Sequence, residues 1–217
     1  MSHKPQLRTV DSRKVILVNG PSESGKDAFA ATALRLGINL QHRKYASRLK
    51  LMTQQFFELP QEIFVALERS GNNTQKNMPL QELHGMSWRE ALIWMGEEVV
   101  KPKFGDEFFG EYLADGMFTT PVRGFVVSDS GFAKEARPVV RKFRPQNVHL
   151  VRVQRPSKDF TGDSRSYWHP AEAGILPENV HTINNSHELD IYQAQCARLI
   201  DKIFGIEDRD YNSLLKG

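Results

Sequence analysis

The chain has 217 residues, 40% hydrophobic and 25% charged, which are the proportions of an ordinary globular protein with one full-sized domain. Its 29 lysines and arginines exceed its 26 aspartates and glutamates by a net charge of +3, which speaks against the dense basic surface of a nucleic-acid binder. A single cysteine, Cys196, excludes an internal disulfide and a cysteine-based metal cluster, and no apolar run has the length of a membrane span.

The first segment, residues 1–13, is polar and lacks the apolar core of a secretion signal, which favours a flexible lead and a cytoplasmic location. The apolar run from Lys14 to Asn19 then predicts a strand buried in a parallel sheet. A helix is expected from Lys26 to Leu36.

The turn between this strand and this helix carries a specific motif. Residues 20–27 read Gly-Pro-Ser-Glu-Ser-Gly-Lys-Asp, the G-x-x-x-x-G-K pattern of a phosphate-binding loop in its required strand–loop–helix context. The glycines let backbone N–H groups point inward, the helix N-terminus adds partial positive charge, and Lys26 reaches the β- and γ-phosphates of ATP. The residues predicted to bind the nucleotide are Gly20, Ser22, Glu23, Ser24, Gly25, Lys26 and Asp27.

Two acids are candidate magnesium ligands. Asp27 stands where a phosphate loop usually carries the serine or threonine that ligates Mg²⁺, so we expect its carboxylate to hold the ion, directly or through a water. The alternative is that Asp27 only caps the helix. Asp129 ends the apolar strand expected from Gly124, which is a Walker B arrangement and predicts a second magnesium ligand next to the substrate.

The rest of the chain alternates helices with strands, which predicts a three-layer α/β fold, a parallel sheet with helices on both faces. A polar surface excursion is expected at 68–86, after which Ser87 and Glu90 have the spacing of a capping box that begins a helix. Further helices are expected at 45–59, 104–117, 134–143 and 189–204, and further strands at 148–153 and 181–184.

The order of these motifs resembles the deoxynucleoside monophosphate kinases of tailed phages. Residues 20–27 match the GxxxxGKD loop of that family, residues 126–129 (VVSD) its V-V-x-D strand, and residues 151–156 (VRVQRP) its V-x-x-x-R-P strand end. The chain departs from the family on the acceptor side, above all at Gly131, where the family's D-x-R motif has arginine. Weaker matches lie at 45–50 (YASRLK), 89–98 (REALIWMGEE), 108–109 (FF), 171–174 (AEAG) and 185–189.

The resemblance implies a P-loop NTPase fold in a single kinase domain at 14–217, with a helical acceptor-binding region at 45–118 and a lid at 156–172. It implies ATP and Mg²⁺ as cofactors, a (deoxy)nucleoside 5′-monophosphate as acceptor, a homodimer as one option, and the host cytoplasm as the location of a phage-encoded protein. Neither a membrane nor a nucleic acid is expected as a partner.

Phosphoryl transfer needs positioning and charge neutralisation more than covalent chemistry, so basic and polar residues are the candidates. Lys26 and two arginines near the lid, Arg155 and Arg165, are expected to neutralise charge in the transition state. By resemblance, Asn185 lies near the donor adenine. The candidates for the acceptor are Tyr45, Arg48, Lys50, Arg89 and Asp129. Each has a plainer interpretation as a solvated charge, a core ring or a helix cap.

Three functions stay open at this point. The first is transfer from ATP to a nucleoside monophosphate, and the second is transfer to another small metabolite, in the manner of dephospho-coenzyme A kinases. The third is a nucleotide-binding module of a phage assembly that has lost turnover, which the missing arginine at Gly131 favours. Such a module would bind ATP without transferring its phosphate.

Overall fold

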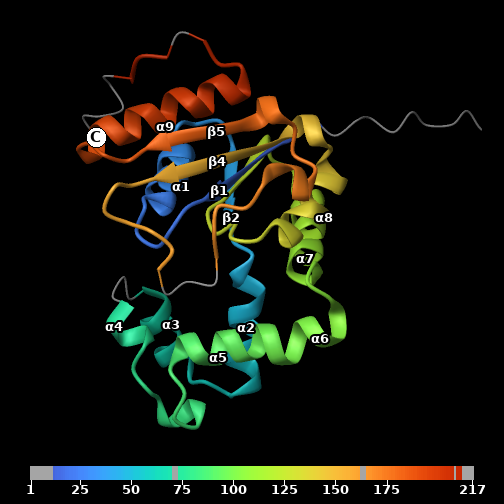
Figure 1. Ribbon diagram of the computed structural model, residues 1–217, viewed down its shortest axis with the longest axis vertical. Helices are drawn as coiled ribbons and strands as arrows, with labels where there is room; N and C mark the ends of the chain where they lie inside the picture. The colour runs from blue at the N-terminus through green and yellow to red at the C-terminus, as the bar shows by residue number, and fades with distance from the viewer. Residues whose placement is uncertain (1–11, 70–72, 162–164, 208, 212–217) are drawn as a thin grey trace, which may run out of the picture.

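The structure, a computed structural model, describes residues 12–69, 73–161, 165–207 and 209–211. These residues form a five-stranded parallel sheet in the order β2-β3-β1-β4-β5, which confirms the predicted α/β class (Figure 1). The strands are β1 (Lys14–Asn19), β2 (Leu40–Arg43), β3 (Gly124–Val127), β4 (Val148–Gln154) and β5 (Val180–Asn184).

The strand order places β1 at the centre of the sheet. The chain visits β2 and β3 on one side of β1 and then crosses to β4 and β5 on the other. In open parallel sheets, ligands bind at the carboxyl ends of the strands where the strand order reverses. The loop at residues 20–27 follows β1 at this point.

Helices cover both faces of the sheet. Helices α1 and α9 pack on one face and α7 and α8 on the other, so the predicted three layers are confirmed. The α-helices are α1 (Lys26–Arg35), α2 (Ala46–Phe56), α3 (Gln61–Arg69), α4 (Asn73–Lys76), α5 (Trp88–Trp94), α6 (Lys101–Phe104), α7 (Phe108–Phe118), α8 (Ala133–Phe143) and α9 (Leu189–Phe204).

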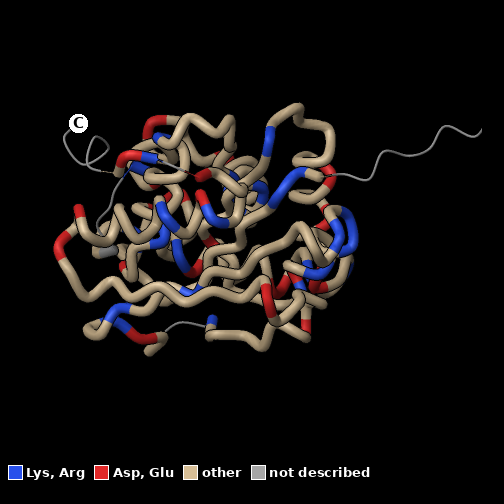
Figure 2. The backbone as a smooth tube through the Cα atoms, turned by 90° about the horizontal axis from the view of Figure 1, so that it is seen from above, with Lys and Arg blue, Asp and Glu red and all other residues tan. Residues whose placement is uncertain are grey.

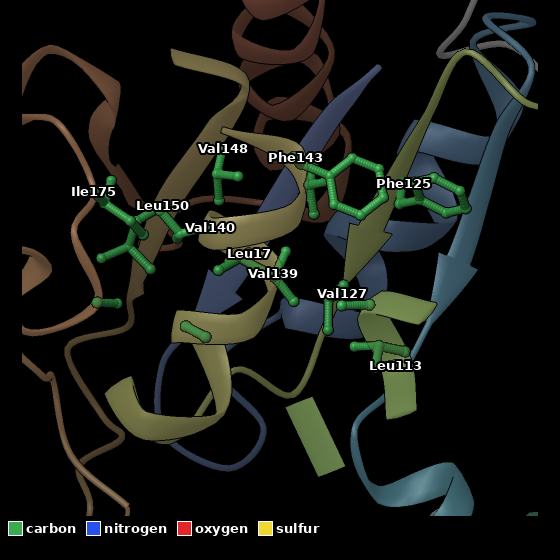
Figure 3. Close-up of a cluster of buried hydrophobic side chains, with 14 of the residues drawn as sticks. Leu17, Leu113, Phe125, Val127, Val139, Val140, Phe143, Val148, Leu150 and Ile175 are labelled. Atoms are coloured by element: carbon green, nitrogen blue, oxygen red, sulfur yellow. The ribbon is translucent and has the colours of Figure 1, made fainter. Parts of the chain in front are cut away.

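The core beneath α7 and α8 shows why these apolar runs form strands. Leu17 of β1 and Val127 of β3 are fully buried and point toward Val139 of α8 (Figure 3). The rings of Phe125 and Phe143 meet edge to face with their centroids 5.8 Å apart. Because both faces of β1 and β3 are covered, their residues are apolar without alternation, as the sequence predicted.

A helical region from α2 to α6 extends beyond the carboxyl edge of the sheet (Figure 1). It has apolar clusters of its own, one of which surrounds Trp88 and Leu83. Ser87 and Glu90 make the predicted capping box at the start of α5. A π-helical turn at Met95–Val100 follows α5. An uninterrupted helical repeat would bury Val99, but the wider π-helical turn shifts the buried position by one residue, to Val100.

The polar excursion expected at 68–86 is partly regular. Residues 70–72 lie outside the described residues, as do 1–11 of the predicted flexible lead and 162–164 of the predicted lid. Leu83, within the excursion, is fully buried in a short 3₁₀ turn. Arg13, the last residue of the predicted lead, donates to the carbonyls of Met117 and Thr120 at 3.1 and 2.8 Å and so belongs to the fold.

Basic and acidic residues are interspersed along the chain rather than gathered on one side (Figure 2). The helices α7 and α8 illustrate this, because Arg141 of α8 pairs with Glu107 at 2.7 Å and Lys142 with Asp115. Across the described ranges, no helix combines the length and the apolar character needed to cross a bilayer.

Candidate functional site

The loop at residues 20–27 has the conformation that a phosphate cradle requires. Gly25 lies at the N-cap of α1 with a φ of 112°, a left-handed conformation that disfavours a side chain. Gly20 has no room for a side chain, because a Cβ would lie 2.6 Å from the carbonyl oxygen of Val153. Both glycines of the motif are therefore required by geometry, and the N-terminus of α1 faces the loop.

The C-terminal part of the chain holds this loop in place. Asn185 donates its side-chain amide to the Ser24 carbonyl at 2.8 Å, and the Tyr192 hydroxyl donates to the Gly25 carbonyl at 3.0 Å. The Asn185 amide is thus engaged with the loop itself, and its predicted place beside the donor adenine stays a prediction. Sequence reasoning missed Tyr192 because its spacing in α9 indicates only a core residue.

Two buried side chains, Asn19 and Ser24, have polar atoms beside the loop. Ser24 is fully buried and Asn19 is 1% exposed, yet neither Ser24 Oγ nor Asn19 Oδ1 has a hydrogen-bond partner among the described residues. Buried polar atoms are nearly always satisfied, so we expect a water or a ligand to complete these two atoms, at the end of β1 and in the loop that follows it.

Lys26 and Arg155 both reach the loop. Lys26 donates its ammonium to the Pro21 carbonyl. Arg155 donates to the carbonyl of Glu23 at 3.0 Å, and Lys158 pairs with the Glu23 carboxylate and lowers its pKa. Lys26 and Arg155, which were predicted to act together, therefore both contact this loop, and their catalytic roles stay predictions.

Asp27, at the start of α1, is an exposed carboxylate with two partners. Lys44 pairs with it at 2.8 Å, and the Ser128 hydroxyl donates to it at 3.0 Å. Ser128 also bonds to His42 Nε2 at 2.8 Å. Loss of surrounding water opposes ionisation of Asp27, but the hydrogen bonds and positive charge of its partners outweigh this and lower its pKa. The group is ionised at neutral pH, as a magnesium ligand must be.

Asp129 has a different set of partners. Its two carboxylate oxygens accept the backbone N–H groups of Tyr45 and Ala46 at 2.9 and 3.0 Å, at the N-terminus of α2. It therefore stabilises a helix start, and Ser128, one residue earlier, is the group that contacts Asp27. Within the part of the chain that is described, no three acidic, histidine or cysteine residues converge as a metal site.

Four basic residues, Lys44, Lys50, Lys76 and Arg89, form what we name the cationic cluster. Burial lowers the pKa of Lys76, and repulsion from Lys50, Lys44 and Arg89 lowers it further. Glu68 partly offsets this and pairs with Lys50 at 2.6 Å. The predicted acceptor residues Lys50 and Arg89 are both near enough to Lys76 to repel its charge, and their role at an acceptor stays a prediction. Lys44 and Lys76 were missed, because no local pattern marks them.

The other predicted acceptor residues are placed differently. Arg48 stacks on the ring of Tyr112, 4.8 Å from its centroid, and its Nε is buried without a hydrogen-bond partner among the described residues. Tyr45 is 4% exposed and its ring packs in the sheet core, and its role at the acceptor stays a prediction. Arg165 is described, and its side chain lies against Gly131.

Glu135 is a further polar residue at this edge of the sheet, and sequence reasoning did not identify it. It lies in the first turn of α8 and is 7% exposed. Burial, and next the negative charge of Asp129, raise the pKa of its carboxyl to about 8. Strongly perturbed acids next to a ligand-binding edge are often functional. An acid in the first turn of a helix is common in any sequence, so no signal distinguished it.

No family model matches the chain, and no curated protein matches it. Similar solved structures include a sugar kinase from Janibacter sp. HTCC2649 (14% identity, TM-score 0.41), TT1252 from Thermus thermophilus (13%, 0.42) and a gluconokinase from Sinorhizobium meliloti 1021 (14%, 0.38). They align with 90%, 91% and 91% of this chain and with 96%, 99% and 99% of their own. Similarity this low identifies no substrate, and the resemblance to the phage family gains no support from it.

Proposed function

We propose that this protein is a P-loop phosphotransferase that moves the γ-phosphoryl group of ATP to an acceptor which itself carries a phosphate, a (deoxy)nucleoside 5′-monophosphate. The observation that carries the proposal is the cationic cluster beside the phosphate loop, which Lys44 joins to the loop through its ion pair with Asp27. Asp27 and Glu68 offset the charges of Lys44 and Lys50, and a phosphate on the acceptor would offset the positive charge that remains around Lys76.

On the donor side, the backbone N–H groups of the loop and Lys26 would bind the β- and γ-phosphates. Arg155, already at the apex of the loop, would add a cation to the oxygens of the transferred group. These groups would position the donor and neutralise its charge, and phosphoryl transfer depends mainly on these two effects.

The donor set around Asp27 fits magnesium. An ionised carboxylate with a neighbouring hydroxyl offers the oxygen ligands that Mg²⁺ takes, and magnesium in nucleotide sites usually has one or two carboxylates plus substrate phosphates. Asp27, with Ser128, would hold the ion. When bound, magnesium supplies charge neutralisation to the donor phosphates.

A coupled assay of ADP formation tests the proposal. ATP and magnesium are supplied with each ribo- and deoxyribonucleoside monophosphate in turn. Turnover of about 1–100 s⁻¹ is expected with one or more of them. Lys26→Ala should abolish it, while Lys202→Ala, which removes an exposed lysine of α9, should not. ATP binding without transfer to any monophosphate would rule out this acceptor class and favour another metabolite or a binding module.

A further inference from the structure

Gly131 is a glycine because of Arg165 and not because of its own backbone. Its φ lies outside the left-handed region in which glycine is favoured. A Cβ at this position would lie 2.5 Å from Cγ of Arg165 and closer still to Cδ. Carbon atoms do not approach so closely, so residues 131 and 165 cannot both carry side chains in this arrangement.

The chain on either side of this contact is fastened. Asn19, at the end of β1, donates its side-chain amide to the carbonyls of Ser130 and Ser166 at 2.8 and 3.1 Å. The indole of Trp168 donates to the same Ser130 carbonyl at 3.1 Å. The residue after Arg165 and the residue before Gly131 are thus held by one side chain, so the position of Arg165 follows from the fold.

The surroundings of Arg165 are polar. Its positive charge favours ionisation of the buried Glu135. Two buried residues with hydroxyl groups, Tyr45 and Ser130, lie in the same surroundings and are 4% and 1% exposed. Burial and the nearby charges of Glu135 and Asp129 raise the pKa of Tyr45, and contact with the Ser130 hydroxyl opposes this.

We infer that Arg165 supplies, from a distant part of the sequence, the cation that the D-x-R motif of the resembling family carries at position 131, and that it binds the phosphate of the acceptor. A guanidinium suits this task because it bonds two phosphate oxygens at once. The inference rests on the proposed function. It also removes the main sequence argument for lost turnover, because an arginine would still be present in the site, supplied by position 165 and not by position 131.

An exchange of the two residues tests this inference. Arg165→Gly should weaken binding of the acceptor monophosphate about 10- to 100-fold, the loss of a charge-assisted hydrogen bond or two, and leave ATP binding unchanged. Gly131→Ala should displace the arginine and cause part of the same loss. The double variant G131R/R165G restores an arginine at this point of the site, with room for it, and should recover most of the affinity. Titration calorimetry with each monophosphate, together with the coupled assay, measures these effects.

The controls separate the possible failures. Arg35→Ala removes an exposed arginine in the last turn of α1 and should change neither affinity, and melting temperatures confirm that every variant is folded. If the wild-type protein binds monophosphates and turns them over but R165G does the same, the inference alone is wrong. It is also wrong if G131R/R165G binds no better than R165G. If the wild-type protein binds no monophosphate, the proposed function fails and the ligand assigned to Arg165 fails with it.

Discussion

The carboxyl group of Glu135 connects stability to pH. The charged groups that face it come from several elements, and they are Asp129, Lys101, Glu97 and Arg165. Burial and Asp129 raise its pKa from 4.5 to about 8. Between these values the native protein keeps a proton that the unfolded chain has released, so the free energy of unfolding falls as the pH rises. One proton contributes about 1.4 kcal/mol per pH unit to this slope.

Glu135→Gln keeps the shape of the side chain and removes the titration. The variant should therefore gain stability relative to the wild-type protein as the pH rises from 5.5 to 8, and the gain should level off above the native pKa. Urea denaturation at a series of pH values measures the difference. Glu62→Gln, at an exposed position of α3, is the matched control and should run parallel to the wild-type protein. Parallel profiles for Glu135→Gln as well would contradict the assigned pKa.

At the residue scale, the sequence could predict groups whose geometry is local. The two glycines and Lys26 of the loop lie within a few residues of each other, and backbone conformation alone sets their spacing. The contact of Ser128 with Asp27 joins residues 101 positions apart and depends on how β3 packs beside β1. The acid at position 129 was found by its pattern, but its partners belong to α2, and no pattern near it describes them.

At the scale of elements, the approach of α7 to α8 depends on Gly110. A Cβ there would lie 2.9 Å from the carbonyl carbon of Glu135 and closer still to its oxygen. Backbone atoms cannot give way as a flexible side chain can, so Gly110→Ala should destabilise the protein by about 1–3 kcal/mol. Gly116, on the same helix, has no atom within 4 Å of its Cβ position, and Gly116→Ala should stabilise by about 0.5–1 kcal/mol. Thermal unfolding compares the two, and equal melting temperatures would show that the helices can separate freely.

The elements that sequence reasoning missed have weak local signals or a changed helical repeat. Strand β2 reads Leu-Gln-His-Arg and is half-buried at the edge of the described sheet, beside β3, so its sequence contains no apolar run that would predict a strand. Helix α3 lies in the helical region and carries its apolar residues Ile63, Phe64 and Leu67 toward the cluster around Trp88. The last helix, by contrast, was predicted with its observed bounds, because its apolar spacing continues without interruption for four turns.

At the scale of the whole molecule, two contacts join the helical region to the sheet at the proposed site. Asp129, after β3, accepts hydrogen bonds from backbone N–H groups at the N-terminus of α2. Lys44, just before α2, pairs with Asp27 at the start of α1. The cationic cluster contains Lys50 of α2, Lys76 of α4 and Arg89 of α5. Under the proposed function, the helical region would form the acceptor side of the site and the sheet the donor side, so that one ligand could span both.

A bisubstrate compound, two nucleosides joined through five phosphates, should consequently bind more tightly than ATP or a monophosphate alone, because the second contact becomes intramolecular. Bound ligand raises the melting temperature according to its affinity and concentration, so thermal shifts at equal concentrations rank the three. Lys76→Ala should weaken the bisubstrate compound and the monophosphate about tenfold and leave ATP unaffected, whereas Lys26→Ala should weaken ATP and the bisubstrate compound. Lys202→Ala serves again as the control. If Lys76→Ala weakened ATP as much as the bisubstrate compound, the cationic cluster would belong to the donor, and the division of the site between sheet and helical region would be wrong.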